Sequence, residues 1–305
     1  MVKHYTNFNI KKLHRGSIIL IGNFDGLHLG HQKLFQLAQS YKKKYNLKIG
    51  VVNFDPMPKM FFNKKLKNFR LSNIDQKIKL LSNLKVDFVI TKKFDKKFSK
   101  TKALDFIIQI LNKKLNSKFI FVSNNFKFGN KREGDVSQLI NYEEIYGYKI
   151  IKPNLLKIKG KIPSSSLIRS YLEKGNLYAA NKFLKRNWTI IGKVQKGRQL
   201  GKKIGFPTCN IDIKDYVLAK PGVYAVKANA KGFKSKIKGI ANLGYRPTFN
   251  QHKLLLEVHL FNFSRNLYNK YLSVEFIKFI RAEKKFRNVK QLQKQIKNDL
   301  LIAKK

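Results

Sequence analysis

Cysteine, acidic residues and long apolar runs are all scarce in this sequence. Cys209 is the single cysteine among 305 residues, so an internal disulfide is excluded and a reducing, cytoplasmic compartment is expected. No run of about eighteen apolar residues occurs, and residues 1–12 lack the apolar core of a secretion signal. The sequence therefore predicts a soluble protein that neither crosses a membrane nor is exported.

The shortage of acidic residues leaves the chain strongly basic. Asp and Glu number 17 against 65 Lys and Arg, which gives a net charge of +48. Such a charge is typical of nucleic-acid binding through phosphate neutralisation. The lysines are scattered along the whole chain, however, and clusters such as residues 42–44 end predicted helices, where cations are favourable. We therefore favour compositional drift and expect no specific nucleic-acid partner, although the basic field would still attract small phosphate compounds.

The apolar content is ordinary and is arranged in two different patterns. Hydrophobic residues make up 43% of the chain, and 305 residues suffice for two domains that each bury a core. In the first part, short apolar strands alternate with amphipathic helices, which predicts an α/β fold with a doubly wound parallel sheet. Strands are expected at 18–21, 48–54, 86–90, 118–123 and 148–158, and helices at 32–45, 74–84, 101–115 and 176–185.

The second part is a series of short β runs with turns between them. We place the domain boundary at Arg186-Asn187, which gives domains 1–185 and 186–305. The pattern predicts a small antiparallel β-barrel, closed so that no strand edge stays exposed. Strands are expected at 188–194, 223–229, 237–243, 254–261 and 272–279, followed by a C-terminal helix at about 288–302.

The most informative stretch is Ser17–His31, which reads SIILIGNFDGLHLGH. An apolar strand, a glycine turn and a helix starting near Gly30 or His31 present backbone N–H groups and a helix dipole to a phosphate. His28 and His31 at this point could neutralise charge that builds on an in-line phosphoryl centre. A metal site is one alternative, but no third ligand lies nearby. Two turn histidines without any role are the other alternative.

Three further segments of the first part carry polar or aromatic groups at element ends. Residues 54–58 place two prolines after a strand and predict an extended loop where open α/β sheets bind ligands. Residues 123–135 combine aromatics, glycines and a basic pair, which could form a ring-stacking pocket. Ser164 to Ser166, with Arg169 one turn further on, form an N-cap signal and equally a donor set for a triphosphate.

The barrel part has its own candidate residues. Gly192–Asn210 carries four glycines on a basic background, which allows backbone N–H groups to approach phosphates closely. Thr208 and Asn210 offer hard oxygen donors suited to Mg²⁺ bridged by phosphates. Glu257 lies in an apolar β run, where a carboxylate is rare without a partner or a task. It could act as a base toward a hydroxyl that attacks a phosphoryl group, or it could simply face solvent.

These motifs resemble one family over about residues 17–299. GNFDGLHLGHQ is similar to the His-x-Gly-His signature of nucleotidylyltransferases, and its wording is closest to the FMN adenylyltransferase half of prokaryotic bifunctional riboflavin kinase/FAD synthetases. The stretch from Gly192 to Asn210 resembles the riboflavin kinase signature Gly-Arg-x-Leu-Gly-Phe-Pro-Thr-Ala-Asn. Further segments match that family in order, at 222–224, 240–249, 256–261, 267–268 and 281–286.

The resemblance implies a Rossmann-like nucleotidylyltransferase domain followed by a riboflavin kinase barrel. It implies that ATP and Mg²⁺ serve the conversion of riboflavin to FMN and of FMN to FAD with release of pyrophosphate, so that flavins are substrates and products. It also implies roles for particular residues: catalysis by His28, His31 and Glu257; nucleotide or phosphate binding by Gly22, Asn23, Phe24, Asp25, Ser164, Ser165, Ser166, Arg169, Gly201 and Lys202; flavin binding by Phe54, Pro56, Asn125, Phe128 and Arg281; and metal binding by Thr208 and Asn210.

The departures from the family pattern concentrate in the first domain. Five positions carry a residue other than the family's usual one, namely Asp55, Met57, Ser123, Asn125 and Leu167. The kinase segment differs mainly at Lys202, which keeps the charge of the usual Arg but loses its bidentate fork. If one activity is weakened, we therefore expect it to be the adenylyltransferase.

Two other functions compete with this interpretation. A different nucleotidylyltransferase, such as one that adenylylates pantetheine phosphate, is opposed by the barrel signatures. A non-catalytic nucleic-acid-binding protein on an old enzyme scaffold is favoured by the charge and opposed by the intact candidate residues His28, His31, Thr208, Asn210 and Glu257. The sequence leaves a weak homo-oligomer open.

Overall fold

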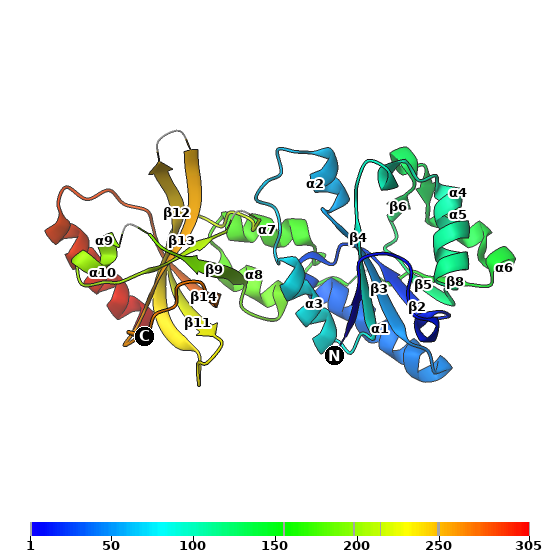
Figure 1. Cartoon of the computed structure of the whole chain (residues 1–305), viewed down its shortest axis with the longest axis horizontal. Coiled ribbons are helices and arrows are strands. Elements are labelled where there is room, and N and C mark those ends of the chain that lie inside the picture. Colours follow the sequence, from blue (N-terminus) through cyan, green and yellow to red (C-terminus); the bar gives the residue numbers. More distant parts are fainter. Residues whose placement is uncertain (1, 155, 198, 214, 249–250, 305) are drawn as a thin grey trace. The chain divides into compact units, whose positions relative to one another are not determined.

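The computed structural model describes residues 2–154, 156–197, 199–213, 215–248 and 251–304. The chain forms two compact units, an α/β unit and a barrel unit (Figure 1). The α/β unit comprises Met1–Leu66 and Ile74–Pro163, and the barrel unit comprises Lys67–Asn73 and Ser164–Lys305. The short segment Lys67–Asn73 thus leaves the first unit and packs with the second.

The α/β unit is built on a six-stranded sheet in which every neighbouring pair is parallel. In spatial order the strands are β1 (Lys3–Tyr5), β4 (Phe88–Lys93), β3 (Ile49–Asp55), β2 (Ile18–Ile21), β5 (Phe119–Phe121) and β8 (Lys149–Ile151). Its helical segments are η1 (Lys12–His14), η2 (Asp25–Leu27), α1 (Leu29–Tyr45), α2 (Pro58–Phe62), α3 (Ile74–Asn83), η3 (Phe98–Lys100), α4 (Ala103–Asp105), the π-helix η4 (Phe106–Lys114), η5 (Asn130–Arg132), α5 (Val136–Asn141) and α6 (Glu143–Tyr146). A small hairpin pairs β6 (Lys127–Phe128) with β7 (Gly134–Asp135).

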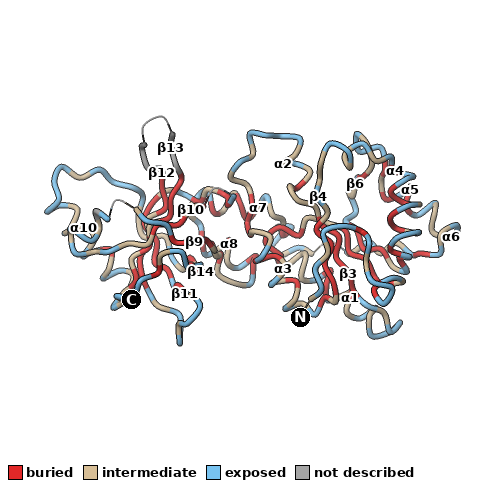
Figure 2. The backbone as a smooth tube through the Cα atoms, in the orientation of Figure 1, coloured by how far each residue is buried: buried red, intermediate tan, exposed pale blue. Residues whose placement is uncertain are grey.

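Alternation along the central strand divides the core of this unit into two layers. Ile18 and Leu20 pack with Phe35 of α1 on one face of the sheet, whereas Ile19 and Ile21 pack on the other face. All four β2 residues are buried, as expected for a parallel strand covered on both faces (Figure 2). The doubly wound parallel sheet predicted from the sequence is confirmed.

The barrel unit is a closed six-stranded antiparallel barrel, as predicted. Its strands in spatial order are β10 (Cys209–Asp212), β13 (Gln251–Leu260), β12 (Ile237–Thr248), β11 (Gly222–Ala230), β14 (Tyr271–Ala282) and β9 (Thr189–Gln195). Its helices are α7 (Ser165–Glu173), α8 (Leu177–Leu184), α9 (Leu200–Lys203) and the C-terminal α10 (Val289–Lys304), which packs against β11, β12 and β14.

Trp188 shows how the segment Lys67–Asn73 joins the barrel. Its side chain is 1% exposed and packs against Phe276 of β14, with the ring centroids 4.7 Å apart. The indole Nε1 donates to the Leu71 carbonyl over 3.1 Å, which satisfies its one donor inside the core. Sequence reasoning did not foresee this contact, because it joins residues 117 positions apart.

Four local features differ from the sequence expectations, the first being that the strand expected at 148–158 spans only Lys149–Ile151 in β8. The strands β1 and β10 are absent from the predicted set, because their short sequences KHY and CNID contain polar and charged residues and form no apolar run. The predicted helix at 101–115 is a short α-helix continued by a π-helix. After Phe54, the expected extended loop is only a cis Asp55–Pro56 peptide bond and a buried Met57, because Pro58 already begins α2, where proline fits the first helical position.

Candidate functional site

The first candidate site is formed at the carboxyl end of β2, where the chain turns into α1. The Gly22 N–H donates to the Val52 carbonyl of β3, and a Cβ at Gly22 would come within 3.1 Å of the Phe24 ring, so glycine permits the close packing of the turn. Phe24 adopts a left-handed conformation with φ 47°. His28 is the N-cap residue of α1, and its carbonyl accepts from the Gln32 N–H.

The two histidines lie face to face at the start of α1. Their ring centroids are 3.7 Å apart with an interplanar angle of 22°, and the His31 ring also meets Phe24 edge-on. Within the described part of the chain, the buried Nδ1 of His31 has no hydrogen-bond partner. Burial, His28 and Lys77 of α3, in that order, hold the pKa of His31 well below its ordinary value. His31 is therefore a neutral imidazole at neutral pH.

A cavity of about 860 Å³ adjoins this turn in the α/β unit. Among the residues predicted to bind ligands, Gly22, Asn23, Phe54, Asn125 and Phe128 line its wall. Seven phenylalanines contribute to the lining, namely Phe54, Phe62, Phe94, Phe98, Phe106, Phe126 and Phe128. Flat rings of this kind can stack on a planar ligand, and the volume is that of a small-molecule site.

The charged side chains that line this aromatic cavity are basic. Four basic side chains contribute to the lining, namely Lys59, Lys127, Lys131 and Arg132, whereas no Asp or Glu occurs among its described lining residues. Lys127 forms an exposed ion pair with Asp135 over 3.1 Å. The cavity thus offers aromatic surface and cations, which suits a planar ring that carries a phosphate.

Three predicted ligand residues of this unit lie away from the cavity wall. Phe24 is 3% exposed and packs in the core with Phe35, and Asp25 is also 3% exposed. Pro56 does not belong to the described residues that line the cavity. A side chain buried in this way acts on the shape of the turn, so a direct contact of Phe24 with a ligand would require the turn to open.

The predicted triphosphate segment belongs to the barrel unit. Ser164 caps α7, since its hydroxyl accepts from the Leu167 N–H over 3.2 Å, and Ser165 and Ser166 form the first turn. Arg169 is 8% exposed, and its guanidinium lies 3.7 Å from the centre of the Phe69 ring while Nε donates to the Phe69 carbonyl. The N-cap role is thus present, and the phosphate role of these residues stays a prediction.

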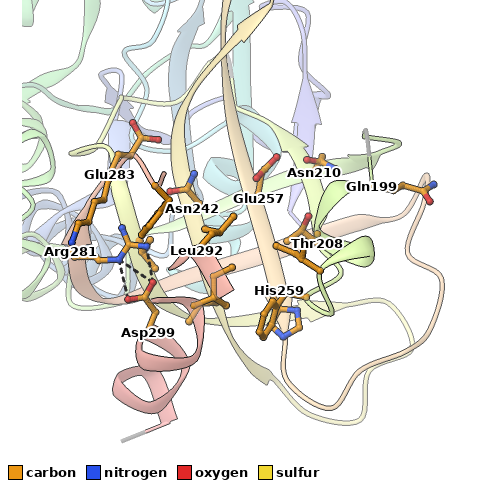
Figure 3. Close-up of a pocket in the computed structure, with 18 residues that line it drawn as sticks. Gln199, Thr208, Asn210, Asn242, Glu257, His259, Arg281, Glu283, Leu292 and Asp299 are labelled. Atoms are coloured by element: carbon orange, nitrogen blue, oxygen red, sulfur yellow. Dashed lines mark hydrogen bonds and ion pairs between the residues drawn. The ribbon is translucent and has the colours of Figure 1, made fainter. Parts of the chain in front are cut away.

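The second candidate site is a cavity of about 370 Å³ in the barrel unit (Figure 3). Of the predicted residues, Gly201, Thr208, Asn210, Glu257 and Arg281 line it. Lys202 is exposed and is not one of the described lining residues. The signature segment and Glu257 are separated by about fifty positions in sequence, and barrel closure brings them to one cavity.

Three polar residues on adjacent strands form a row across this cavity. Glu257 of β13 pairs in register with Asn210 of β10 on one side and with Asn242 of β12 on the other. Residues paired across neighbouring strands lie on the same face, and Figure 3 shows the three side chains next to one another. Two amides therefore flank the carboxylate, which suits a base held in place for proton transfer.

The donor atoms beside Glu257 fit a magnesium ion. The Asn210 side-chain oxygen is buried and has no hydrogen-bond partner among the described residues, and the Thr208 hydroxyl lines the same cavity. Oxygen ligands of this kind, few in number and completed by phosphates and water, are what Mg²⁺ prefers. A Cβ at Gly197 would lie 2.1 Å from the Asn210 amide nitrogen, so this glycine makes room for the amide.

Arg281 is held by the C-terminal helix. Its Nε donates to both carboxylate oxygens of Asp299 over 3.0 Å, and a terminal nitrogen donates over 2.8 Å. Asp299 is 1% exposed and also accepts from Gln295. The guanidinium further faces the ring of Phe286. This bidentate pair holds α10 against β14 at the cavity. In this structure Arg281 therefore stabilises the wall of the pocket.

Asn242 and His259 are among the polar residues of the barrel cavity to which sequence reasoning gave no role. Both lie inside segments that matched the family, at 240–249 and 256–261. Residues two apart on a strand share a face, so the period of β13 alone could have placed His259 beside Glu257. Asn242 could not be found in this way, because its nearness to Glu257 depends on the register of two strands.

Comparison with known proteins matches both parts of the chain. The family model described as FAD synthetase matches residues 10–167, and the one described as riboflavin kinase matches residues 184–305. A bifunctional riboflavin kinase/FMN adenylyltransferase from Buchnera aphidicola subsp. Schizaphis graminum is 41% identical over 97% of this chain and 96% of its own length. The protein of that name from Escherichia coli K12 is 37% identical over 94% of this chain and 92% of its own.

A solved structure supports the same architecture over the whole chain. It is titled as a macrolide-efflux protein from Streptococcus pneumoniae, has a TM-score of 0.86 and 27% sequence identity, and covers 99% of this chain and 98% of its own. None of the helices in the described ranges of the present chain has the length and apolar character needed to span a membrane. Since matches to both family models and to full-length relatives agree, the chain belongs to the family of bifunctional riboflavin kinase/FMN adenylyltransferases.

Proposed function

We propose that the chain makes FAD from riboflavin in two ATP-dependent steps, one in each unit. The barrel unit phosphorylates riboflavin to FMN, and the α/β unit adenylylates FMN to FAD. The observation that carries this proposal is that each unit holds its own cavity with its own chemistry. One cavity has a carboxylate between two amides, and the other has aromatic rings and cations beside Gly22 and Asn23 of the turn that leads to the histidine pair.

In the kinase step, Glu257 takes the proton of the terminal ribityl hydroxyl. The hydroxyl oxygen then attacks the γ-phosphorus of ATP, the bond from that phosphorus to the β,γ-bridging oxygen breaks, and ADP leaves. Asn210 and Asn242 flank Glu257 and keep its carboxylate in the cavity. Thr208 and Asn210 would hold Mg²⁺, which supplies charge neutralisation on the phosphates when bound.

In the adenylyl step the nucleophile is already an anion, so no protein base is needed. A phosphate oxygen of FMN attacks the α-phosphorus of ATP, the bond to the α,β-bridging oxygen breaks, and pyrophosphate leaves. His28 and His31 donate hydrogen bonds to the oxygens on which charge builds. Neutral His31 retains one N–H for this purpose. The aromatic cavity with Phe54, Phe128 and Asn125 would hold the flavin ring system.

The proposal also includes the other assignments predicted from the sequence. They are the phosphate roles of Gly22, Asn23, Phe24, Asp25, Ser164, Ser165, Ser166, Arg169, Gly201 and Lys202, the flavin roles of Pro56 and Arg281, and the division of the activities at residue 186. Small-molecule substrates are the proposed partners, without a specific nucleic acid, and the cytoplasm is the proposed location. The charge of +48 would favour entry of anionic substrates into both cavities.

The test is incubation of the purified chain with riboflavin, ATP and Mg²⁺, followed by chromatographic separation of the flavins. We expect riboflavin to pass through FMN to FAD, with ADP formed in the first step and pyrophosphate in the second. FMN as the only product would overturn the adenylyltransferase half, and unchanged riboflavin with a folded chain would overturn the kinase half. FMN supplied directly, with ATP, tests the second step without the first.

A further inference from the structure

His259 of β13 lies in the barrel cavity and contacts the turn that carries Thr208. It follows Glu257 by two residues, so both side chains lie on the same face of the strand, and both line the cavity (Figure 3). The His259 Nδ1 is 2.8 Å from the Pro207 carbonyl oxygen. A carbonyl can only accept, so Nδ1 carries the proton and donates it to Pro207.

The same turn is held from its other side by a glycine. The Phe206 N–H donates to the Gly201 carbonyl over 2.8 Å, and a Cβ at Gly201 would lie 2.4 Å from the Phe206 carbonyl oxygen. The Phe206 ring meets the His259 imidazole edge-on, with centroids 5.8 Å apart and an angle of 84°. The turn is therefore enclosed between the glycine segment and β13.

Thr208 itself lies just outside the strand ladder. The paired residues of β10 begin at Cys209, which is in register with Val258. The hydrogen bond from His259 reaches the carbonyl of the residue before Thr208. A side chain of the strand that bears Glu257 thus fixes the backbone that presents the Thr208 hydroxyl. The distance between carboxylate and hydroxyl then depends in part on this contact.

We propose that His259 is a positioning residue of the kinase site. Through its Nδ1–H bond to Pro207, it sets the Thr208 hydroxyl relative to Glu257 and so to the phosphates of the nucleotide. This inference rests on the proposed kinase function of the barrel. His259 itself takes no part in proton transfer to or from the substrate.

Two amide substitutions distinguish the effect of losing the hydrogen bond from the effect of losing the volume of the ring. In His259→Asn the side-chain NH₂ lies near the place of Nδ1, whereas in His259→Gln it lies near the place of Nε2. We expect His259→Gln and His259→Leu to raise KM for ATP about tenfold, the effect of one lost hydrogen bond. We expect His259→Asn to stay within about threefold of the parent chain, because it keeps the donor.

Binding supplies a readout that does not depend on turnover. Titration calorimetry with ADP and Mg²⁺ should show the same order of affinity, with the parent chain and His259→Asn above His259→Gln and His259→Leu. Adenylylation of FMN by the other unit should be equal in all four proteins, which controls for folding and concentration. Trp188 fluorescence during denaturation reports whether the barrel of each variant is folded.

Equal KM and equal ADP affinity in all variants would overturn the inference. An equal loss in His259→Asn and His259→Gln would also overturn it, since ring packing rather than the donated hydrogen bond would then be responsible. Failure of the parent chain to form FMN would instead overturn the proposed kinase function. The two failures are therefore distinguishable in one set of assays.

Discussion

The two cavities of this protein differ in whether carboxylates are among the charged groups that line them. The barrel cavity is lined by the carboxylates Glu257, Glu283 and Asp299, by the basic residues Arg281 and Lys284, and by amides and a hydroxyl, and Arg281 is paired with Asp299. In the α/β cavity, the described charged residues of the lining are all basic. Transfer to a hydroxyl requires a base, whereas attack by a phosphate anion requires only cations and hydrogen-bond donors. The difference between the cavities thus follows the difference between the two proposed nucleophiles.

The framework of the two cavities differs in a second respect. The α/β cavity is placed at the carboxyl ends of parallel strands, and its groups come from strand ends, short helices and the loops between them. In the barrel cavity, Asn210, Glu257 and Asn242 stand on paired strands, where register fixes their spacing. Sites on strands are held more rigidly than sites on loops, so we expect substitutions to act more locally in the barrel.

The largest effect is expected from removing the proposed base. Glu257→Gln keeps the size of the side chain but cannot accept a proton, so FMN formation should fall by about 10³-fold. Adenylylation of supplied FMN should be unchanged. Separate rate measurements for the two reactions check this prediction. An equal fall in both rates would contradict the assignment of one reaction to each cavity.

The next effect concerns the stability of the barrel. Asp299→Ala removes the buried partner of Arg281 and should lower the free energy of unfolding of the barrel by about 3 kcal/mol. Denaturation followed by the fluorescence of Trp188, the only tryptophan, measures the change. Asp299→Asn, which keeps one acceptor, should lose less. Because α10 also lines the cavity, KM for riboflavin should rise in parallel. An unchanged KM would show that the position of α10 does not affect riboflavin binding.

The corresponding test of the α/β cavity is His28→Ala. Removal of one donor to the α-phosphate should lower adenylylation of FMN by about 10²-fold, so that the flavins stop at FMN. Phosphorylation of riboflavin should not change. A mutant that lost both activities would show that the histidine pair is needed for more than the adenylyl step.

A smaller effect follows from the low pKa of His31. Because the folded-state pKa lies below the ordinary value of 6.5, the unfolded chain binds more protons as the pH falls. The stability that neutral His31 provides is therefore complete above about pH 6.5 and decreases toward acid pH, by at most about 1.4 kcal/mol per pH unit. Hydrogen exchange of α1 amides from pH 7 to pH 5 should show this slope.

The control for this slope is His31→Asn, which cannot titrate in that range. The pKa values of His4 and His14 are also lowered, mainly by burial, so both proteins keep a shared background slope. The difference in slope between the parent chain and His31→Asn gives the contribution of His31 alone. Identical slopes would mean that His31 keeps an ordinary pKa.

The smallest effect concerns the cationic wall of the aromatic cavity. Lys131 is exposed and left-handed, with φ 49°, a conformation that costs a residue with a Cβ about 1 kcal/mol relative to glycine. Lys131→Gly should therefore be more stable than Lys131→Ala by about 1 kcal/mol, measured by chemical denaturation. Both variants lose the cation, so a rise in KM for FMN that is equal in the two would show that the charge contributes to binding.

Much of the candidate chemistry could be predicted from short segments. His28 and His31 were found because a strand, a glycine turn and a helix start follow one another within fifteen residues, and Glu257 because a carboxylate is unusual in an apolar strand. The roles of all these residues stay predictions, and the structure places two of the predicted ligand residues, Phe24 and Pro56, off the cavity wall. Their direction depends on how a turn packs, which local sequence does not encode.

The sequence by itself determined the two fold classes, the order of the two parts and the motifs, because hydrophobic periods and turn residues act over short distances. The tertiary structure alone decided which strands are neighbours, and hence that Asn242 lies beside Glu257 and that His259 reaches Pro207. It also decided that Leu71 packs with Trp188. These contacts depend on strand register and on chain segments far apart in sequence, which become neighbours only when the cores close.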